Sequence, residues 1–421
     1  MLTSVEARGI HNFTGKSDYS EGTIPGSFII HLISPQNIVD VCVTDEDKKT
    51  TQATIDKFKD RYNNGKRTVM DSMLNWYSEY FGGVATPGKL IVYPDKNDKS
   101  KILEVSLPLV PSLSRWFRDE KFQPEILKYI DKAVDRAYSL GAKLTGLGGF
   151  NSVASLGGKT LFDNHPLIKS GEMCVDNGNA LTAGIAYKGL IKLMDDLCIN
   201  IETTNISIIG ATGSIGRVFS RMLSKINKGK LHLIANTESE LKKMKRDLGN
   251  YHPNIEAIGK DNIERKKALH LSDICVIVSS AVNFQDLGVS IEDFKPGSVI
   301  LDVGRPRTVP ENIIELRPDI FATEGGVIDF PSELGEIIPS GILGMGHKKI
   351  FACLGELILL CLEGRKENFS VGTIQEDKVW EILKISEKWG FELSGYRMFD
   401  RPIPDERLVE VKRIRCELAS I

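Results

Sequence analysis

The stretch from Asn205 to Gly216 constrains the fold of this chain more than any other. It reads Asn-Ile-Ser-Ile-Ile-Gly-Ala-Thr-Gly-Ser-Ile-Gly, and apolar residues at helical spacing follow it. A β-branched run, a glycine turn and a helix start come in the order that a dinucleotide pyrophosphate needs. Gly210 permits a tight turn, Gly213 lets the backbone approach the phosphates, and Gly216 lets the helix pack on the strand. The pattern predicts a nicotinamide-type cofactor and an oxidoreductase.

Strand-like and helix-like segments alternate around this turn, with strands near 206–210, 231–236, 254–258, 274–279, 298–303 and 319–323. Such alternation predicts an α/β fold with a doubly wound parallel sheet, a Rossmann domain. Outside it we expect a strand over 103–109 and helices over 343–362 and 378–389. We divide the chain into an N-terminal α/β substrate domain (1–180), a Rossmann NADP-binding domain (181–345) and a C-terminal helical segment (346–421), which we expect to return to the N-terminal domain and pack on the cleft.

The composition points to an ordinary soluble globular protein. The 421 residues are 41% hydrophobic and 26% charged, and the net charge of −2 favours neither nucleic acid nor a membrane surface as partner. No apolar run is long enough to span a bilayer. Seven scattered cysteines without a Cys-x-x-Cys pair fit reduced thiols, and the histidines lack metal-ligand spacing. We expect a cytoplasmic protein without a metal and, on general grounds, a homodimer.

The end of the second strand favours NADP over NAD. NAD enzymes usually carry Asp or Glu there to hold the ribose hydroxyls, whereas this chain has Asn236 and Thr237. The missing carboxylate removes repulsion against a 2′-phosphate, and Lys242 on the next helix adds a cation. Further contacts are expected at the carboxyl edge of the sheet, where the nicotinamide lies in such domains. The expected cofactor-binding residues are Gly210, Thr212, Gly213, Ser214, Ile215, Gly216, Asn236, Thr237, Lys242, Ser279, Ser280, Ala281, Val303, Gly304 and Gly326.

A second set of motifs runs from about Leu144 to Gly372. Its members are Gly146–Ser152, Gly178-Asn179 with Thr182-Ala183, Gly210–Gly216, Asp302 with Gly304 and Pro306, Gly325–Val327, Phe351–Glu356 and Glu367–Gly372. In order and spacing they resemble the cyanobacterial-type long-chain acyl-[acyl carrier protein] reductases, within the amino-acid-dehydrogenase-like NAD(P)-binding superfamily. The resemblance implies NADPH as cofactor, a substrate bound to an acyl carrier and an aldehyde product.

The chain departs from this family at one position. Family members carry a cysteine, thought to take up the acyl group, just before the strand that ends in the Asp-x-Gly turn. Ser298 stands there in this chain, and no His or Asp neighbours it in sequence to activate it. Ser298 is therefore either a replacement nucleophile or, as we favour, an ordinary residue at the strand entry. In the second case the hydride goes directly to a non-covalently bound substrate, or the substrate is not a thioester.

The region also resembles the shikimate-type and methylene-tetrahydrofolate-type dehydrogenases, through Lys295–Gly304. In that group a C-terminal helix returns to the first domain and the chemistry lies in the cleft between domains. Lys159 stands where the shikimate type carries a catalytic lysine, which can donate or accept the proton that accompanies hydride transfer. A flexible surface lysine is the alternative. Asp176 is a candidate to orient Lys159 or to bind substrate.

Two candidates come from the segment before and within the apolar helix near residue 356. A carboxylate such as Glu356 is costly to bury in so apolar a helix unless it is paired, which makes it a better functional candidate than Cys353. His347 lies among glycines just before this helix and is the histidine we expect to act as an acid, a base or a substrate contact.

These features together predict an NADPH-dependent oxidoreductase that acts on an acyl thioester, an aldehyde or a keto group. One alternative is a shikimate-type or methylene-tetrahydrofolate-type dehydrogenase that uses Lys159. The other is a non-catalytic NADP-binding partner protein, which the loss of the family cysteine motivates.

Overall fold

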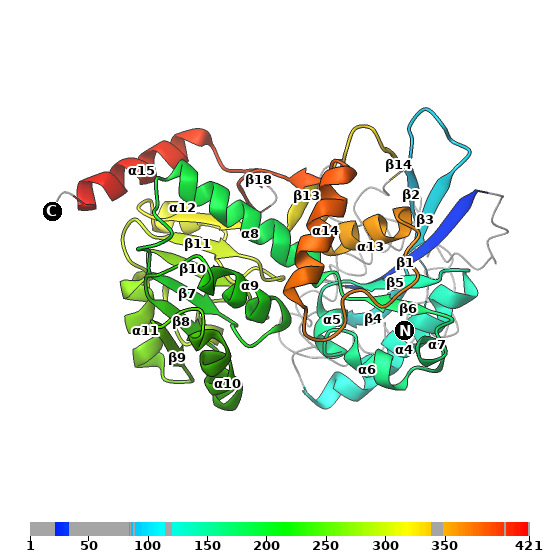
Figure 1. Ribbon diagram of the computed structural model, residues 1–421, viewed down its shortest axis with the longest axis horizontal. Coiled ribbons are helices and arrows are strands. Elements are labelled where there is room, and N and C mark those ends of the chain that lie inside the picture. Colours follow the sequence, from blue (N-terminus) through cyan, green and yellow to red (C-terminus); the bar gives the residue numbers. More distant parts are fainter. Residues whose placement is uncertain are drawn as a thin grey trace, which may run out of the picture. The chain divides into compact units, whose positions relative to one another are not determined.

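The computed structural model describes residues 22–32, 84, 86, 89–113, 120–337, 348–399 and 401–419 (Figure 1). The chain forms two compact units, each built from two separate stretches of sequence. Unit 1 contains Met1–Gly178 and Phe330–Gly372, and unit 2 contains Asn179–Asp329 and Thr373–Ile421.

Unit 2 is organised around a six-stranded sheet. Its strands are β7 (Ile206–Ile209), β8 (Leu231–Ile234), β9 (Ile255–Ile258), β10 (Ile274–Ile277), β11 (Val299–Asp302) and β12 (Phe321–Glu324). They run in the spatial order β12-β11-β10-β7-β8-β9, and every neighbouring pair is parallel. This is the doubly wound order, with the direction of winding reversed between β7 and β10. The predicted α/β fold with a parallel Rossmann sheet is confirmed.

The strands of this sheet are short apolar runs because both faces are covered. All four residues of β7, β8, β10, β11 and β12 are buried. The helices of the unit are α8 (Asn179–Asp196), α9 (Ser214–Ser224), α10 (Glu238–Gly249), α11 (Asn262–Leu271), α12 (Ile313–Leu316), α14 (Glu376–Lys388) and α15 (Asp405–Ala419). Short elements complete it: η3 (Gln285–Leu287), η4 (Ile291–Asp293), β13 (Val327–Asp329), β16 (Glu392–Leu393), β17 (Arg397–Met398) and β18 (Arg401–Pro402).

Unit 1 contains a mixed sheet. Its strands are β1 (Thr23–Leu32), β2 (Lys89–Tyr93), β3 (Ile102–Ser106), β4 (Leu109–Leu113), β5 (Leu144–Leu147), β6 (Cys174–Asp176) and β14 (Gly335–Ile337), in the order β14-β2-β3-β1-β5-β6 with β4 on β1. The parallel neighbours of β1 are β3, β4 and β5, and β5 is parallel to β6. The other elements are η2 (Glu120–Phe122), α4 (Gln123–Ser139), α5 (Phe150–Ala154), α6 (Lys159–Asn164), α7 (Pro166–Lys169), β15 (Lys349–Phe351) and α13 (Ala352–Leu362).

Helix α13 packs on β1 and β5, and glycines on these strands make room for it. A Cβ on Gly26 would lie 3.0 Å from Cys361 Sγ, and a Cβ on Gly146 would lie 3.4 Å from Leu357 Cβ and 2.6 Å from a Phe28 ring carbon. The sheet therefore has small residues under the helix.

Two expected elements differ from the structure. The single strand expected over 103–109 is two strands, β3 and β4, separated by Leu107 and Pro108. Proline has no N–H to donate to the sheet and restricts the residue before it, and Pro108 stands at this break, although Pro111 is accommodated within β4. The helix expected over 343–362 begins at Ala352, because residues 349–351 form β15; residues 343–347 lie outside the described part.

Candidate active site

The glycine turn after β7 lies at the switch point of the unit 2 sheet. Gly210 has a φ of +88°, and a Cβ there would lie 2.6 Å from the carbonyl oxygen of Val278, just after β10. A Cβ on Gly216 would lie 2.2 Å from the carbonyl oxygen of Gly210 and 2.9 Å from Ala211 Cα. Strand, turn and helix are packed backbone against backbone, so both positions require glycine.

The turn leads into the N-terminus of α9, whose N-cap is Gly213. No side chain caps this helix, and its first backbone bond runs from Arg217 N to Gly213 O at 2.9 Å. The first N–H groups of a helix have no partner within the helix, and together with the helix dipole they favour an anion. The turn, its glycines and the uncapped helix start therefore fit the pyrophosphate of a dinucleotide.

The end of β8 is built from Asn236 and from Thr237, the N-cap of α10. Asn236 Oδ1 accepts a hydrogen bond from Arg265 Nη2 of α11 at 2.7 Å. Lys242 lies on the first turns of α10, 4.0 Å from Glu238, and both side chains are exposed. Sequence reasoning missed Arg265, because nothing near it in sequence marks it as a neighbour of β8.

The other expected cofactor residues lie at the carboxyl edge of β10, β11 and β12. The carboxylate of Asp302, at the end of β11, accepts N–H bonds from Gly304 at 3.0 Å, Thr308 at 2.7 Å and Val309 at 3.0 Å, and so fixes the following loop. A Cβ on Gly304 would lie 2.6 Å from the carbonyl oxygen of Ser279, the residue whose Oγ accepts from Ala281 N at 3.1 Å. The loops after β10 and β11 are thus in contact.

Gly326, after β12, reaches a neighbouring helix at the same edge. It has a φ of +82°, and a Cβ there would lie 3.2 Å from Thr182 Cγ2 on the first turn of α8.

A charged cluster that the sequence did not reveal lies beside this edge. Glu324, the last residue of β12, has a fully buried side chain and accepts hydrogen bonds at 2.7 Å from both Arg305 and Arg307. Arg307 also stacks on Phe399, 4.8 Å from the ring centroid. Two guanidinium groups are therefore held at the carboxyl edge of the sheet.

Ser298 lies at the opposite, amino edge of the sheet, immediately before β11. Its side chain is buried, and its Oγ lacks a hydrogen-bond partner in the part of the chain that the structure describes. The expected cofactor residues follow the carboxyl ends of the strands, so the structure does not bring Ser298 together with them.

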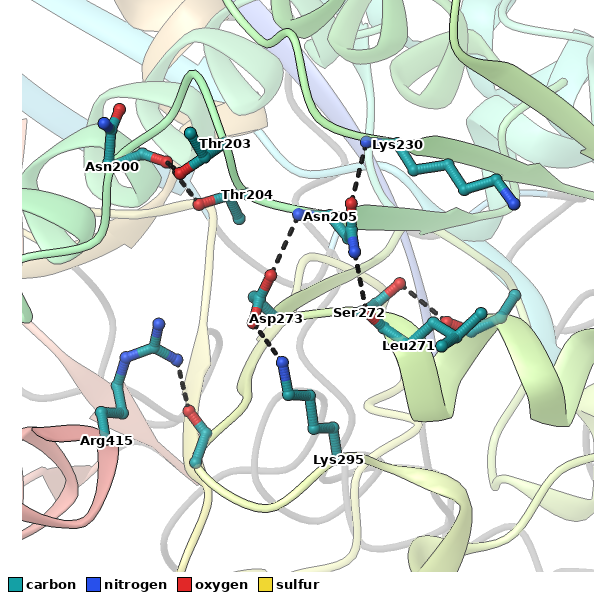
Figure 2. A network of polar contacts seen from close by, with 12 residues as sticks. Asn200, Thr203, Thr204, Asn205, Lys230, Leu271, Ser272, Asp273, Lys295 and Arg415 are labelled. Carbon is teal, nitrogen blue, oxygen red and sulfur yellow. Dashed lines mark hydrogen bonds and ion pairs between the residues drawn. The ribbon is translucent and has the colours of Figure 1, made fainter. Parts of the chain in front are cut away.

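The amino edge is instead tied by a network of structural hydrogen bonds (Figure 2). Asn205, before β7, accepts from Lys230 N at 2.9 Å through Oδ1 and donates from Nδ2 to the carbonyl of Leu271 at 3.2 Å. Asp273 accepts from Asn205 N at 3.0 Å and from Lys295 Nζ at 2.7 Å. These bonds fix the starts of β7, β8 and β10.

Asp176 and Glu356 come together in unit 1. Both side chains are 0% exposed, and Glu356 lies near enough to Asp176 to affect its pKa. Asp176 also accepts from Gly178 N at 3.0 Å and from Ser370 N at 3.1 Å, while Glu356 accepts from Ser370 Oγ at 2.7 Å. Burial and a neighbouring carboxylate both disfavour ionisation, so the two groups do not ionise together and one of them holds a proton.

Burial, followed by the neighbouring Glu356, raises the pKa of Asp176 well above the ordinary carboxyl range. Burial likewise raises the pKa of the Cys353 thiol, on the first turn of α13, to about 12. Cys353 is therefore a protonated thiol at neutral pH.

Lys159 is not joined to this pair. Lys159 begins α6, and its Nζ is paired with Asp163 at 2.6 Å, not with Asp176; both side chains are largely exposed. His347 lies outside the described residues. Within the described ranges, no group of three or more His, Cys, Asp or Glu side chains is placed to hold a metal ion. In those same ranges, no helix combines the length and the apolar character needed to cross a membrane.

Three curated proteins are similar in sequence to this chain, among them an aminotransferase and an acyl-carrier-protein reductase, and no family model matches it. Aminotransferase PigE of Serratia sp. is 30% identical over 284 residues, which make up 65% of this chain but only 30% of PigE. The long-chain acyl-[acyl-carrier-protein] reductase of Synechococcus elongatus is 26% identical over 272 residues, 62% of this chain and 74% of the reductase.

Solved structures are similar only weakly. A dipicolinate synthase chain from Bacillus halodurans has a TM-score of 0.29 at 14% identity, and the match covers 45% of this chain and 60% of the synthase chain. CAD from Helicobacter pylori, complexed with NADP(H), has a TM-score of 0.26 at 14% identity, and the match covers 38% of this chain and 41% of CAD.

Proposed function

We propose that this chain is an NADPH-dependent oxidoreductase that reduces an acyl thioester, an aldehyde or a keto group. The observation that carries the proposal is the glycine turn, with its uncapped helix start, at the switch point of a doubly wound sheet. The name of the Synechococcus relative supports reduction of an acyl group on a carrier protein. The name of PigE does not oppose it, because 70% of PigE lies outside the matched segment.

The cofactor is proposed to bind along the carboxyl edge of the unit 2 sheet. Residues 210–216 hold the pyrophosphate through backbone N–H groups, and the residues after β10, β11 and β12 hold the nicotinamide half. When bound, the nicotinamide supplies the hydride. Arg305 and Arg307 place positive charge at this edge, which stabilises negative charge on a carbonyl oxygen or an anionic group of the substrate.

The Asp176–Glu356 pair of unit 1 is proposed as a buried proton-holding group, because both side chains are 0% exposed and burial raises the pKa of Asp176. The pair holds a proton in an environment that excludes water, and Ser370 contacts both carboxyl groups. Removing one carboxyl should therefore change the pH dependence of stability rather than cofactor affinity.

The proposal is tested by following NADPH oxidation with a long-chain acyl thioester, with an aldehyde assay alongside. NADPH loss with aldehyde formation supports a reductase, and unchanged activity of Ser298→Ala shows that no acyl-enzyme forms at that serine. Activity only with a hydroxy acid or folate substrate, lost in Lys159→Ala, supports the dehydrogenase alternative. Cofactor binding without turnover of any carbonyl substrate in a broad panel supports a non-catalytic role.

A further inference from the structure

The guanidinium of Arg265 is an unusual buried charge in unit 2. The residue is 6% exposed, and its bonds run to four neutral oxygens: Gly259 O at 2.7 Å, Leu287 O at 2.7 Å, Ala235 O at 3.3 Å and Asn236 Oδ1 at 2.7 Å. No carboxylate pairs with it among the described residues. Burial lowers its pKa, but a guanidinium stays protonated at neutral pH. Its positive charge is therefore uncompensated and lies directly behind the end of β8.

This charge fixes the orientation of the Asn236 amide. A guanidinium can only donate hydrogen bonds, so the amide must turn its oxygen towards Arg265 and its NH2 group away from it. Asn236 is exposed, so that NH2 group is presented at the end of β8. Enzymes that use NAD place a carboxylate here, which accepts hydrogen bonds from the ribose hydroxyls. This chain presents a donor where those enzymes present an acceptor.

A second guanidinium, that of Arg217, lies between the glycine turn and the helix that follows β8. Arg217, on α9, donates from Nε to the carbonyl of Thr212 at 2.8 Å and pairs through Nη2 with Glu240 on the first turn of α10. The Arg217 side chain therefore bridges the turn that would hold the pyrophosphate and the helix that follows β8.

We propose that Asn236, oriented by Arg265, and Arg217 together recognise the 2′-phosphate of NADP(H). The inference rests on the proposed function and deepens it by assigning cofactor choice to named groups. Asn236 and Arg217 contact the phosphate. Arg265 is a positioning residue, which orients the amide and adds positive potential from behind. Glu240 pairs with the Arg217 guanidinium in this structure and yields it to the phosphate when the cofactor binds.

The test measures dissociation constants of NADPH and NADH by cofactor fluorescence, with no substrate present. The wild type should bind NADPH more tightly. Asn236→Asp should lower the ratio of the NADH to the NADPH constant by about tenfold or more, because the new carboxylate accepts from ribose hydroxyls and repels a phosphate. It should also fold, since the carboxylate pairs with Arg265. Arg217→Gln should weaken the binding of NADPH and leave the binding of NADH nearly unchanged.

Two further variants separate recognition from structure. Asn250→Asp, at the exposed end of α10, adds the same charge without contact and should leave the ratio unchanged. Arg265→Lys keeps the charge but loses the planar fork, so it should lower the ratio of the NADH to the NADPH dissociation constant. A variant that only loosens the fold would weaken the binding of both cofactors alike. A ratio that is unchanged in Asn236→Asp and in Arg217→Gln overturns the inference.

Fragments separate failure of this inference from failure of the proposed function. Wild-type protein should bind 2′,5′-ADP more tightly than 5′-AMP, and Asn236→Asp should abolish the difference. Equal binding of NADPH and NADH refutes phosphate recognition but leaves a dinucleotide enzyme. Binding of neither dinucleotide refutes the proposed function itself.

Discussion

Replacing Gly216 by alanine tests the packing of the glycine turn. The new Cβ would lie 2.2 Å from the carbonyl oxygen of Gly210, whereas real Cβ contacts are essentially never below 3.0 Å. Helix α9 must therefore move away from the turn by close to 1 Å. Such overpacking costs about 1–3 kcal/mol. Alanine returns up to about 1 kcal/mol of helix propensity. Taking the middle of the overpacking range, about 2 kcal/mol, and subtracting this gain leaves a net loss of about 1–2 kcal/mol in the free energy of unfolding.

For a unit of 150–250 residues, each kcal/mol corresponds to about 2–4 °C, so the Tm of unit 2 should fall by about 2–8 °C. Thermal unfolding followed by circular dichroism measures this change. The matched control is Gly249→Ala at the end of α10, where nothing lies within 4 Å of the added Cβ. That variant should be neutral or slightly stabilising. Equal Tm values for Gly216→Ala and the wild type would refute the packing argument, whatever the cofactor does.

Three more predictions concern the carboxyl pair, a buried histidine and the amino edge. The folded wild-type pair keeps a proton that unfolded carboxyls release above about pH 4, so wild-type stability should fall as the pH rises above that value. Glu356→Gln supplies an N–H in place of that proton. The urea midpoints of the variant at pH 5 and pH 8 should therefore differ less than those of the wild type. Burial lowers the pKa of His232 to about 4, so between about pH 6.5 and 4 the unfolded chain binds a proton on this histidine that the folded chain does not. Stability should therefore drop as the pH falls through this range. Urea titrations of His232→Gln should show a smaller drop. Asn205→Ala removes the two side-chain hydrogen bonds to Lys230 N and to the carbonyl of Leu271 at the amino edge. It should lower the free energy of unfolding, measured in urea, by about 1–3 kcal/mol. An unchanged free energy of unfolding would show that water replaces these bonds.

The strands and helices of unit 2 could be predicted because their signals are local. A buried parallel strand is a short apolar run, and the glycine turn is a contiguous motif, so both are read from neighbouring residues. The break at Pro108 was also a local signal, but the apolar residues on both sides of it suggested one strand.

The site residues were harder to predict because their partners are distant in sequence. The cost of burying a carboxylate identifies Glu356 as a candidate from the sequence. Its partners cannot be predicted in the same way, because Ser370 lies 14 residues later in a loop and Asp176 lies on another element, β6. Arg265 reaches Asn236 from 29 residues away and looks like any helix arginine in the sequence. Ser298 was aligned by motif, and only the topology shows that it lies at the amino edge.

The division of unit 1 between two stretches of sequence has a consequence during synthesis. Strands β1 and β5 expose the glycines that accommodate α13, yet this helix leaves the ribosome about 200 residues after β5, roughly 10–40 s later at about 5–20 residues per second. The unit 2 strands are made in that interval and need no segment of unit 1 to complete their sheet. The face of the unit 1 sheet that α13 covers therefore lacks its helix while the strands of unit 2 are being made.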